Sequence, residues 1–364
     1  MRDTTSIITL LTTLAVLMLS PVLNAHHSNA PHYDRDRPIT IQGVVEAFEF
    51  VNPHAFLHIR AENEDGESVV WACEMQTANT LRRRGWTEDR FVVGQEVTVQ
   101  GIAARRDPLG CSYNSGELAD GTTIGRSGAV VVPESAAVTE PERGAVVELE
   151  SGPAAEPERA ALLAGGIPNL AGPWMRDRSR RQRGIGPGGQ RPGADRLTLA
   201  GLAAAEGYDD RFDDPSFECS ASSITRAWSE PGTPTDIEQY DDRVIIHHEY
   251  MDTVRTIRLA EAHVENLTPR QYGHSIGSYE DSTLVVDTVG FSAGVLTPHP
   301  GILHSDSLHM TERITVDPDG PGIVVEWTAE DPEYFKEAFS GTSYFTPSSY
   351  PVREYDCTPE HANR

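Results

Sequence analysis

A stretch rich in proline, alanine and glutamate, residues 133–166, divides the sequence into two parts. It contains several Pro-Glu and Ala-Ala steps and no aromatic residue. Such a composition buries too little apolar surface to offset the entropy lost on folding, so we expect a linker. A chain of 364 residues also tends to split into domains rather than build one core. We therefore expect two modules, residues 26–132 and residues 167–364.

The first 25 residues are typical of a secretory signal peptide. Arg2 precedes an apolar run, residues 7–19, that is too short for a stable membrane span. Pro21 then interrupts the helix, and Ala25 is a small residue at a cleavage point; Ser28-Asn29-Ala30 offers a second one. No later stretch reaches the length of a membrane span. We expect a periplasmic or secreted protein.

The charge balance argues against nucleic acid as a partner. The formal net charge is −25, and Lys336 is the single lysine among 30 basic residues. An acidic surface repels phosphate backbones, and it serves solubility or attracts cations.

The 4 cysteines fit an oxidising compartment. Three pairings are possible, and sequence alone does not choose among them. Pairing within each module is the simplest solution, which joins Cys73 to Cys111 and Cys219 to Cys357.

The first module has the pattern of a small barrel. Alternation and β-branched residues predict strands over residues 39–45, 55–59, 69–74, 94–101 and 129–132. Asp65-Gly66 is a hairpin turn, and a short helix from Thr77 to Arg84 ends at Gly85. Five short strands and one helix predict an OB-like barrel.

The second module has the pattern of a larger barrel. Strands are predicted over residues 243–250, 253–259, 283–288, 309–316 and 322–329, after a helix from Leu197 to Glu206. No helical crossover separates these strands, so the sheet must be mostly antiparallel. Closure into a lipocalin-like barrel removes the sheet edges. The sequence thus predicts an all-β protein with minor helices, an OB-like barrel followed by a lipocalin-like β-barrel.

Five different short motifs lie within residues 26–125. They are His26-His27-Ser28, Asn52-Pro53-His54-Ala55, Trp71-x-x-Glu74, Leu81-x-Arg83-Arg84-Gly85-Trp86 and Gly94-x-x-Val97-Thr98-Val99-x-Gly101. Together they resemble a family of small exported bacterial proteins of unknown function. The resemblance implies export and the module boundary, and it brings no established activity.

The second module resembles another uncharacterised exported bacterial domain. The matching stretches are residues 249–255, 273–277, 284–291, 304–306 and 330–332. Tyr279 stands where such domains usually carry a tryptophan. This resemblance also implies export and assigns no catalytic residue.

Export itself would create a candidate metal site. Cleavage after Ala25 makes His26 the new terminus, whose α-amino and ring nitrogens can chelate one ion together. An imidazole from His54 or His58 would complete a nitrogen-only set that suits Cu(II). His27 and His32 are alternative donors. The alternative without a metal site is a disordered terminus. Cleavage after Ala30 would remove His26 and with it the site.

A second candidate site lies in the second module, where seven of the 13 histidines fall between residues 247 and 309. If the inner face carries His247, Glu249 and Arg255, the barrel holds a charged cluster suited to acid–base chemistry. A metal site and a purely structural network are the alternatives. The candidate catalytic residues are His247, Glu249, Arg255, His274, His304, Asp306 and His309.

Two other motifs point to loops or strands rather than to chemistry. The glycine-rich residues 184–189 lack the strand and helix that flank a phosphate-binding loop. Gly273-His274-Ser275-Ile276-Gly277 has the spacing of a nucleophile elbow, but a β-strand follows where the elbow needs a helix.

These observations favour an exported accessory or binding protein, with copper or another metal at the processed N-terminus and a small ligand in the second barrel. The alternative is an enzyme, an isomerase, cyclase or hydrolase, that uses the His/Asp/Glu cluster of the second barrel. A third hypothesis is an interaction protein whose linker joins two docking modules.

Overall fold

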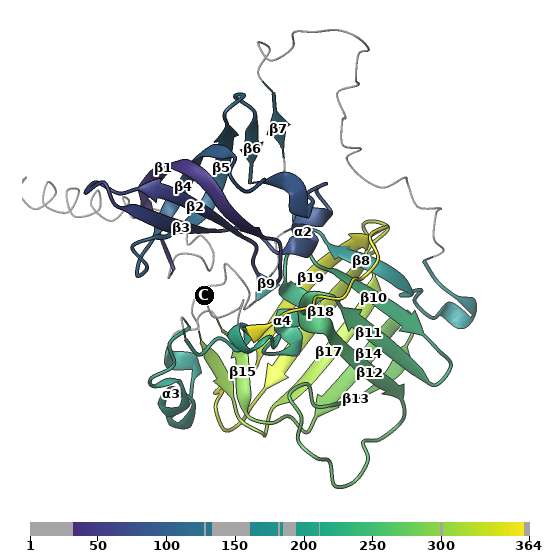
Figure 1. The fold of residues 1–364 in the computed structure, drawn as a ribbon. Helices are drawn as coiled ribbons and strands as arrows, with labels where there is room; N and C mark the ends of the chain where they lie inside the picture. Colours follow the sequence, from purple (N-terminus) through teal and green to yellow (C-terminus); the bar gives the residue numbers. More distant parts are fainter. Residues whose placement is uncertain are drawn as a thin grey trace, which may run out of the picture.

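A computed structural model of the chain describes residues 32–126, 129–132, 161–180, 183–184, 194–210, 212–298 and 301–359 (Figure 1). The predicted signal peptide, His26, His27 and residues 133–160 of the predicted linker lie outside these ranges. The described chain is mostly β-strand, and its strands form two barrels, which confirms the all-β prediction.

The first barrel is a closed ring of five strands. Its members are β1 (Tyr33–Glu49), β2 (Phe56–Glu62), β3 (Ser68–Glu74), β4 (Glu96–Ala104) and β5 (Gly110–Leu118). The ring runs β3-β2-β1-β4-β5 and closes through a parallel pairing of β3 with β5, in the strand order of an OB-like barrel. The short strands β6 (Thr123–Gly125) and β7 (Val130–Val131) extend the sheet from β5.

The sequence misplaced the fifth strand of this ring. Residues 129–132 were the predicted strand, but β7 lies outside the ring, and β5 closes it. The sequence of β5, Gly-Cys-Ser-Tyr-Asn-Ser-Gly-Glu-Leu, is poor in β-branched residues. Packing decides its structure, because Cys111 and Tyr113 are fully buried in the core of the barrel.

One predicted helix of each module is present. Helix α2 (Ala78–Arg82) begins after Thr77, whose side chain accepts a hydrogen bond from the Thr80 amide. Helix α3 (Leu199–Ala205) lies within the second predicted span. The other helices within the described residues are α4 (Ile224–Ser229) and the single-turn helices η1 (Glu88–Arg90), η3 (Ala164–Gly166), η4 (Ala194–Arg196), η5 (Pro215–Glu218) and η6 (Tyr250–Asp252).

The second barrel is a closed ring of nine strands. In ring order they are β8 (Gly172–Arg176), β10 (Pro234–Gln239), β11 (Arg243–His248), β12 (Thr253–Leu259), β13 (His274–Glu280), β14 (Thr283–Val289), β17 (His309–Val316), β18 (Ile323–Glu330) and β19 (Phe339–Pro347). The short strand β9 (Arg183–Gly184) pairs with β19 along the edge that also pairs with β8, and β15 (Gly294–Thr297) and β16 (Ile302–His304) form a separate hairpin.

Neighbouring strands of this ring follow one another in the chain, and every pair is antiparallel except β12 with β13. A ring with an odd number of strands cannot alternate direction all the way round, so one parallel pair is required. The mostly antiparallel prediction is confirmed. The parallel pair, which we call the seam, was not predicted from the sequence.

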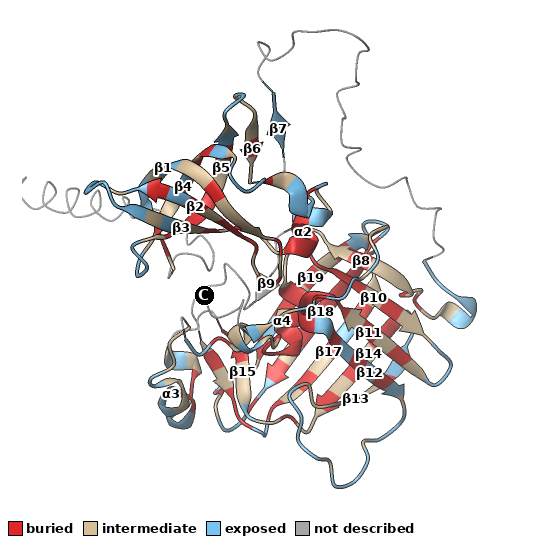
Figure 2. Cartoon of the chain, in the orientation of Figure 1, coloured by how far each residue is buried: buried red, intermediate tan, exposed pale blue. Residues whose placement is uncertain are grey.

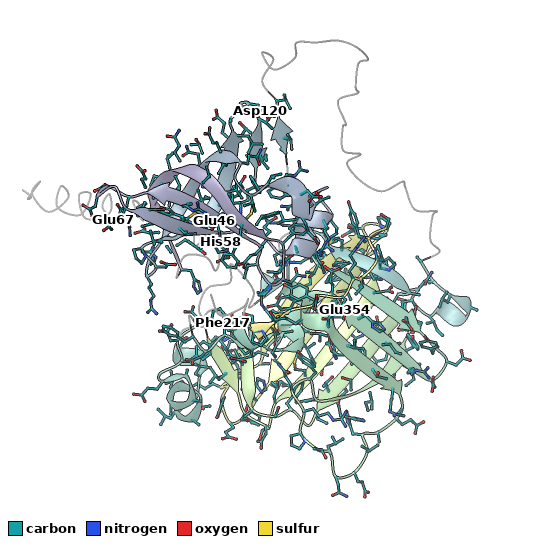
Figure 3. The ribbon with its side chains drawn as sticks, in the orientation of Figure 1. Glu46, His58, Glu67, Asp120, Phe217 and Glu354 are labelled. Carbon is teal, nitrogen blue, oxygen red and sulfur yellow. A yellow bond between two sulfur atoms is a disulfide. The ribbon has the colours of Figure 1, made fainter. Side chains whose placement is uncertain are left out.

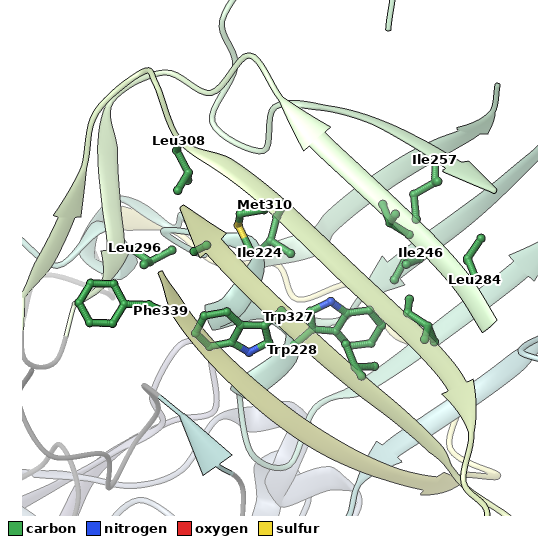
Figure 4. Packing of buried hydrophobic residues seen from close by; sticks show 14 of the residues in the cluster. Ile224, Trp228, Ile246, Ile257, Leu284, Leu296, Leu308, Met310, Trp327 and Phe339 are labelled. Carbon is green, nitrogen blue, oxygen red and sulfur yellow. The ribbon is translucent and has the colours of Figure 1, made fainter. Parts of the chain in front are cut away.

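The interior of the second barrel is a packed core. Burial alternates along β11 and β12, so every second side chain points inward (Figure 2). Helix α4 contributes Ile224 and Trp228 to the same cluster as Trp327 and Phe339 (Figure 4). Large aromatic side chains therefore fill space in which a lipocalin-like cup would hold its ligand.

Both predicted disulfides are formed, one within each module. Cys73 and Cys111 are register partners across the parallel β3–β5 pair, so their bond spans the closure of the first barrel. Cys219 and Cys357 join the start of the second module to its C-terminal segment. No helix in the described ranges is long and apolar enough to span a membrane.

The two barrels meet along a polar contact that we call the junction, formed by α2 and its flanks on one side and residues 232, 249 and 350–357 on the other. The side-chain amide of Asn79 donates to the Glu354 carbonyl at 3.1 Å, and Glu354 marks this region in Figure 3. Arg83 Nη1 lies 2.8 Å from Oε1 of Glu249, and both side chains are almost fully buried. Because charged groups are rarely buried unless paired, the junction is a specific contact.

Candidate functional site

The wall of the second barrel is only partly paired at the seam. Pairing joins Ile257–Leu259 of β12 to Ser275–Gly277 of β13, whereas residues 253–256 of β12 pair with β11 alone. Because the strands are parallel, a long connection, residues 260–273, must return the chain to the start of β13. The unpaired half of β12 and this connection enclose a pocket of about 810 Å³. That volume is within the range of small-molecule sites.

We call this pocket the side pocket. It is lined by residues 254–256 and 258 of β12, by residues 264, 266–268 and 270–273 of the connection, and by His274 and Ser275. Residues from both faces of β12 line it, since Arg255 is buried while Val254 and Thr256 are exposed. The lining therefore includes a charged residue whose side chain belongs to the barrel interior.

Two glycines shape the seam. Gly273 has φ of 61°, and a Cβ there would lie 2.7 Å from the Val289 carbonyl oxygen. A Cβ on Gly277 would lie 2.8 Å from the Ile257 side chain on the neighbouring strand. The Gly-His-Ser-Ile-Gly motif thus meets the backbone demands of the parallel pair. Ser275 lies inside β13 and is not on a nucleophile elbow.

Arg255, one of the lining residues, belongs to an ion pair inside the barrel. Arg255 Nη1 donates to Oε1 of Glu312 at 3.0 Å, and Nη2 donates to Oε2 at 2.6 Å. The Trp228 indole donates to the same Oε1 at 2.6 Å. A buried carboxylate is tolerated when such charge-assisted hydrogen bonds replace its water.

Arg255 has hydrogen-bonding capacity to spare. Its Nη2 also donates to the Ser275 hydroxyl at 3.2 Å, and that hydroxyl shares a hydrogen bond of 2.9 Å with Thr288. The Arg255 Nε is buried and has no hydrogen-bond partner among the described residues. A buried N–H without an acceptor is costly, so an acceptor placed beside Nε would be stabilising.

A neutral histidine lies near this ion pair. His248 accepts or donates at Nδ1 with the Thr235 hydroxyl at 2.9 Å, and its ring packs edge-on against Trp228. Burial holds the pKa of His248 well below its usual value, and the positive charge of Arg255 acts in the same direction. His248 is therefore an uncharged member of the interior.

A chain of hydrogen bonds runs along the outer wall from the rim of the pocket. His274 Nδ1 lies 2.9 Å from His263 Nδ1, and His263 Nε2 lies 2.7 Å from Oδ1 of Asp287. His309 Nε2 donates to the other oxygen of Asp287 at 2.7 Å. Since a carboxylate only accepts, His263 donates to Asp287. A single proton then lies between the Nδ1 atoms of His263 and His274, so one of them donates and the other accepts. The chain ends at the pocket, because His274 lines it.

The pKa values of this chain follow from its surroundings. Burial opposes ionisation of Asp287, but the hydrogen bonds from His263 and His309 prevail and lower the pKa of that carboxyl. Burial lowers the pKa of His274, and the positive charges of His263, Arg258 and Arg270 lower it further. His274 is thus a neutral imidazole in a positively charged setting.

The predicted catalytic residues do not converge on one point. His247 faces away from the interior, and on the outer face its Nε2 lies 3.3 Å from Glu238. Glu249 lies past the end of β11, at the junction. His247, Glu249 and Arg255 therefore do not share the inner face of the barrel. The strand alternates as expected, and its buried face carries His248 instead of His247.

The structure does bring some predicted residues together. Arg255 and His274 both line the side pocket, and His309 joins His274 through Asp287 and His263. His304 is buried apart from them, with Nδ1 2.8 Å from the Ser305 carbonyl, and burial lowers its pKa. Asp306 is exposed.

Glu249 contributes to the junction. Burial raises the pKa of its carboxyl, and Arg83 partly offsets that effect. One carboxylate oxygen also accepts from the Arg353 amide at 3.1 Å. These contacts give Glu249 a structural role between the barrels.

The predicted metal donors of the first barrel contact carboxylates. His54 Nδ1 lies 3.2 Å from Glu74, and His58 Nε2 lies 3.2 Å from Glu49 (His58 is labelled in Figure 3). The described residues contain no group of three histidines, cysteines or carboxylates arranged to hold a metal ion. The third donor, His26, lies outside them.

Sequence reasoning missed Glu312 and the pocket arginines, Arg258 and Arg270. A signal for Glu312 was present, because it alternates with Met310 and Ile314 on the buried face of β17. No sequence signal marked the two arginines, because the pocket that brings them together depends on the parallel pairing at the seam.

Residues 15–111 match a family model described as a family of unknown function (DUF6152). The match supports the uncharacterised family predicted for the first module. The resemblance of the second module stays a prediction. No curated protein matches this chain.

Proposed function

We propose that this chain is an exported binding protein whose second barrel holds a small molecule in the side pocket at the seam. The observation that carries the proposal is the pocket itself, about 810 Å³, which reaches the buried Arg255. Sites of this kind combine apolar lining with a few polar groups that fix orientation. The two disulfides support export, because such bonds persist in oxidising compartments.

The side pocket replaces the barrel interior as the proposed binding place. In the interior, Trp228 and Trp327 belong to one cluster of buried side chains. A ligand there would have to displace packed aromatic groups, whereas the side pocket requires no unfolding of the core. The partly paired β12 also leaves backbone groups of residues 253–256 without strand partners on the pocket side.

A thermal-shift screen of small metabolites tests the proposal. Ligands that bind the pocket are expected to raise the melting temperature of the wild-type protein, and Val264→Trp is expected to abolish that shift by filling the pocket. Val131→Trp is the matched control, because Val131 is 63% exposed and Val264 59% exposed. If a ligand raised the melting temperature of Val264→Trp as much as that of the wild type, it would bind outside the side pocket.

A second candidate function is acid–base catalysis in the same pocket. It is favoured by the chain from Asp287 through His263 to His274, in which a carboxylate orients one imidazole against another. His274 would accept or donate the proton at the ligand. Mass spectrometry of a bound metabolite incubated with the protein tests it. Conversion that is lost in His274→Gln while binding persists supports catalysis; an unchanged metabolite leaves binding as the function.

Copper at the processed N-terminus also remains a proposal. Tyr33, near the start of the described chain, donates a hydrogen bond to Glu74, which contacts His54. Tyr33 therefore lies close to one of the proposed donors. Intact-mass analysis of the secreted protein, followed by copper titration of wild type and His26→Ala, tests this. A terminus after Ala30, or equal copper binding by both proteins, would remove the site.

A further inference from the structure

We infer that the ligand of the side pocket is an apolar molecule with one anionic group, such as a carboxylate. The inference rests on the proposed function and adds the chemical class of the ligand. It follows from the charges, the unpartnered donor and the apolar surface of the pocket.

The pocket has the opposite charge from the chain as a whole. The formal net charge of the protein is −25, yet the described lining residues include Arg255, Arg258 and Arg270 and no aspartate or glutamate. Within the described residues, the guanidinium groups of Arg258 and Arg270 form no ion pair. A local positive potential on an acidic protein attracts an anion to that place and away from the rest of the surface.

Arg255 supplies a specific donor. Glu312 and Ser275 use both Nη groups of Arg255, but the buried Nε has no acceptor among the described residues. An oxygen of a ligand carboxylate would satisfy this N–H without disturbing the pair with Glu312. A neutral apolar ligand would leave the donor unsatisfied.

The rim supplies apolar surface. Val254 is 53% exposed and Val264 59% exposed, and both line the pocket together with Leu267 and Tyr272. Exposed apolar side chains gathered in one pocket indicate a partner with apolar surface of its own. The anionic group therefore belongs to a molecule with an apolar body, which distinguishes it from inorganic phosphate or sulfate.

Calorimetric titration with three alkyl-chain probes tests the inference. Dodecanoate, dodecanol and dodecyltrimethylammonium have similar alkyl chains and carry an anionic, a neutral and a cationic head group. We expect dodecanoate to bind about tenfold more tightly than dodecanol at low salt, with the advantage reduced as salt is added. We expect the cationic probe to bind most weakly.

Variants connect that preference to the pocket. The double variant Arg258→Gln/Arg270→Gln is expected to lose most of the preference for dodecanoate, whereas Arg313→Gln is expected to retain it. Arg313 is a matched control because it is an outer-face arginine paired with Glu280, away from the lining. Val264→Trp should abolish binding of dodecanoate.

A second readout follows the pocket directly. Bound dodecanoate should raise the pKa of His274 in an NMR titration, since a nearby anion favours the imidazolium, and dodecanol should not. Equal affinities for the three probes, no binding of dodecanoate, or a preference that persists in the double variant would overturn the inference. The proposed function would still stand if metabolites from the thermal-shift screen bound the wild-type protein and did not bind Val264→Trp.

Discussion

Arg255 and Glu312 form a two-pronged ion pair inside the second barrel, with Arg255 Nη2 2.6 Å from Glu312 Oε2 and side-chain exposures of 2% and 0%. The pair joins β12 to β17, which are not neighbours in the ring. It therefore crosses the interior and fixes the position of the arginine that reaches the side pocket. Arg255 therefore belongs both to the lining of the pocket and to the interior of the barrel.

Arg255→Met should destabilise the second barrel strongly. It leaves the Glu312 carboxylate buried without its cation, a loss of about 3–5 kcal/mol in the free energy of unfolding. Urea denaturation followed by tryptophan fluorescence measures the change. The control Arg243→Met removes an exposed pair with Asp242 and should cost under about 1 kcal/mol. Equal costs would show that Glu312 does not depend on Arg255.

Arg83→Met should weaken the junction. It leaves Glu249 buried without its partner, and it also removes a hydrogen bond to the Gly232 carbonyl. We expect a loss of about 3–5 kcal/mol in the stability of the contact between the barrels. Small-angle scattering and limited proteolysis should report more extended, more readily cleaved protein. An unchanged scattering profile would argue that the junction does not hold the barrels together.

Removal of the Cys219–Cys357 disulfide should lower stability. The bond links residues separated by 138 positions, and closing so long a loop restricts the unfolded chain. The double variant Cys219→Ser/Cys357→Ser should lose about 2–5 kcal/mol in urea denaturation. Wild-type protein under reducing conditions serves as comparison. A stability equal to that of the oxidised wild type would show that non-covalent contacts suffice.

The stability of the second barrel should fall as the pH drops below about 6.5, the usual pKa of histidine. Burial holds the pKa of His248 below that value in the folded state, so only the unfolded chain takes up its proton there. The free energy of unfolding should decrease by up to about 1.4 kcal/mol per pH unit from this residue. His248→Asn should reduce the slope between pH 7 and 5. An unchanged slope would mean that other groups cause the acid sensitivity.

The sequence predicted the architecture better than the site. Alternation in β11 and β12, the turn residues and the cysteines were enough to indicate two β-barrels and both disulfides, because these features act locally or within one module. The sequence left the phase of β11 open, because His247 and His248 are equally plausible inward residues in a strand that alternates. Packing of His248 against Trp228, from a helix earlier in the chain, decides it.

The side pocket was beyond sequence reasoning for a topological reason. Nothing local in residues 253–259 or 274–280 shows that these strands run parallel. That direction follows from the closure of nine strands into one ring. Gly273 and Gly277 were visible in the sequence, and the nucleophile-elbow reading was already disfavoured, but only the register of the seam shows why both positions need glycine.

The decisive measurement is a crystal structure of the full chain with the metabolite that gives the largest thermal shift. We expect ligand density between β12 and residues 264–273, with a ligand acceptor atom within hydrogen-bond distance of Arg255 Nε. Density among Trp228 and Trp327 in the barrel interior, or at the junction near Glu249, would contradict it.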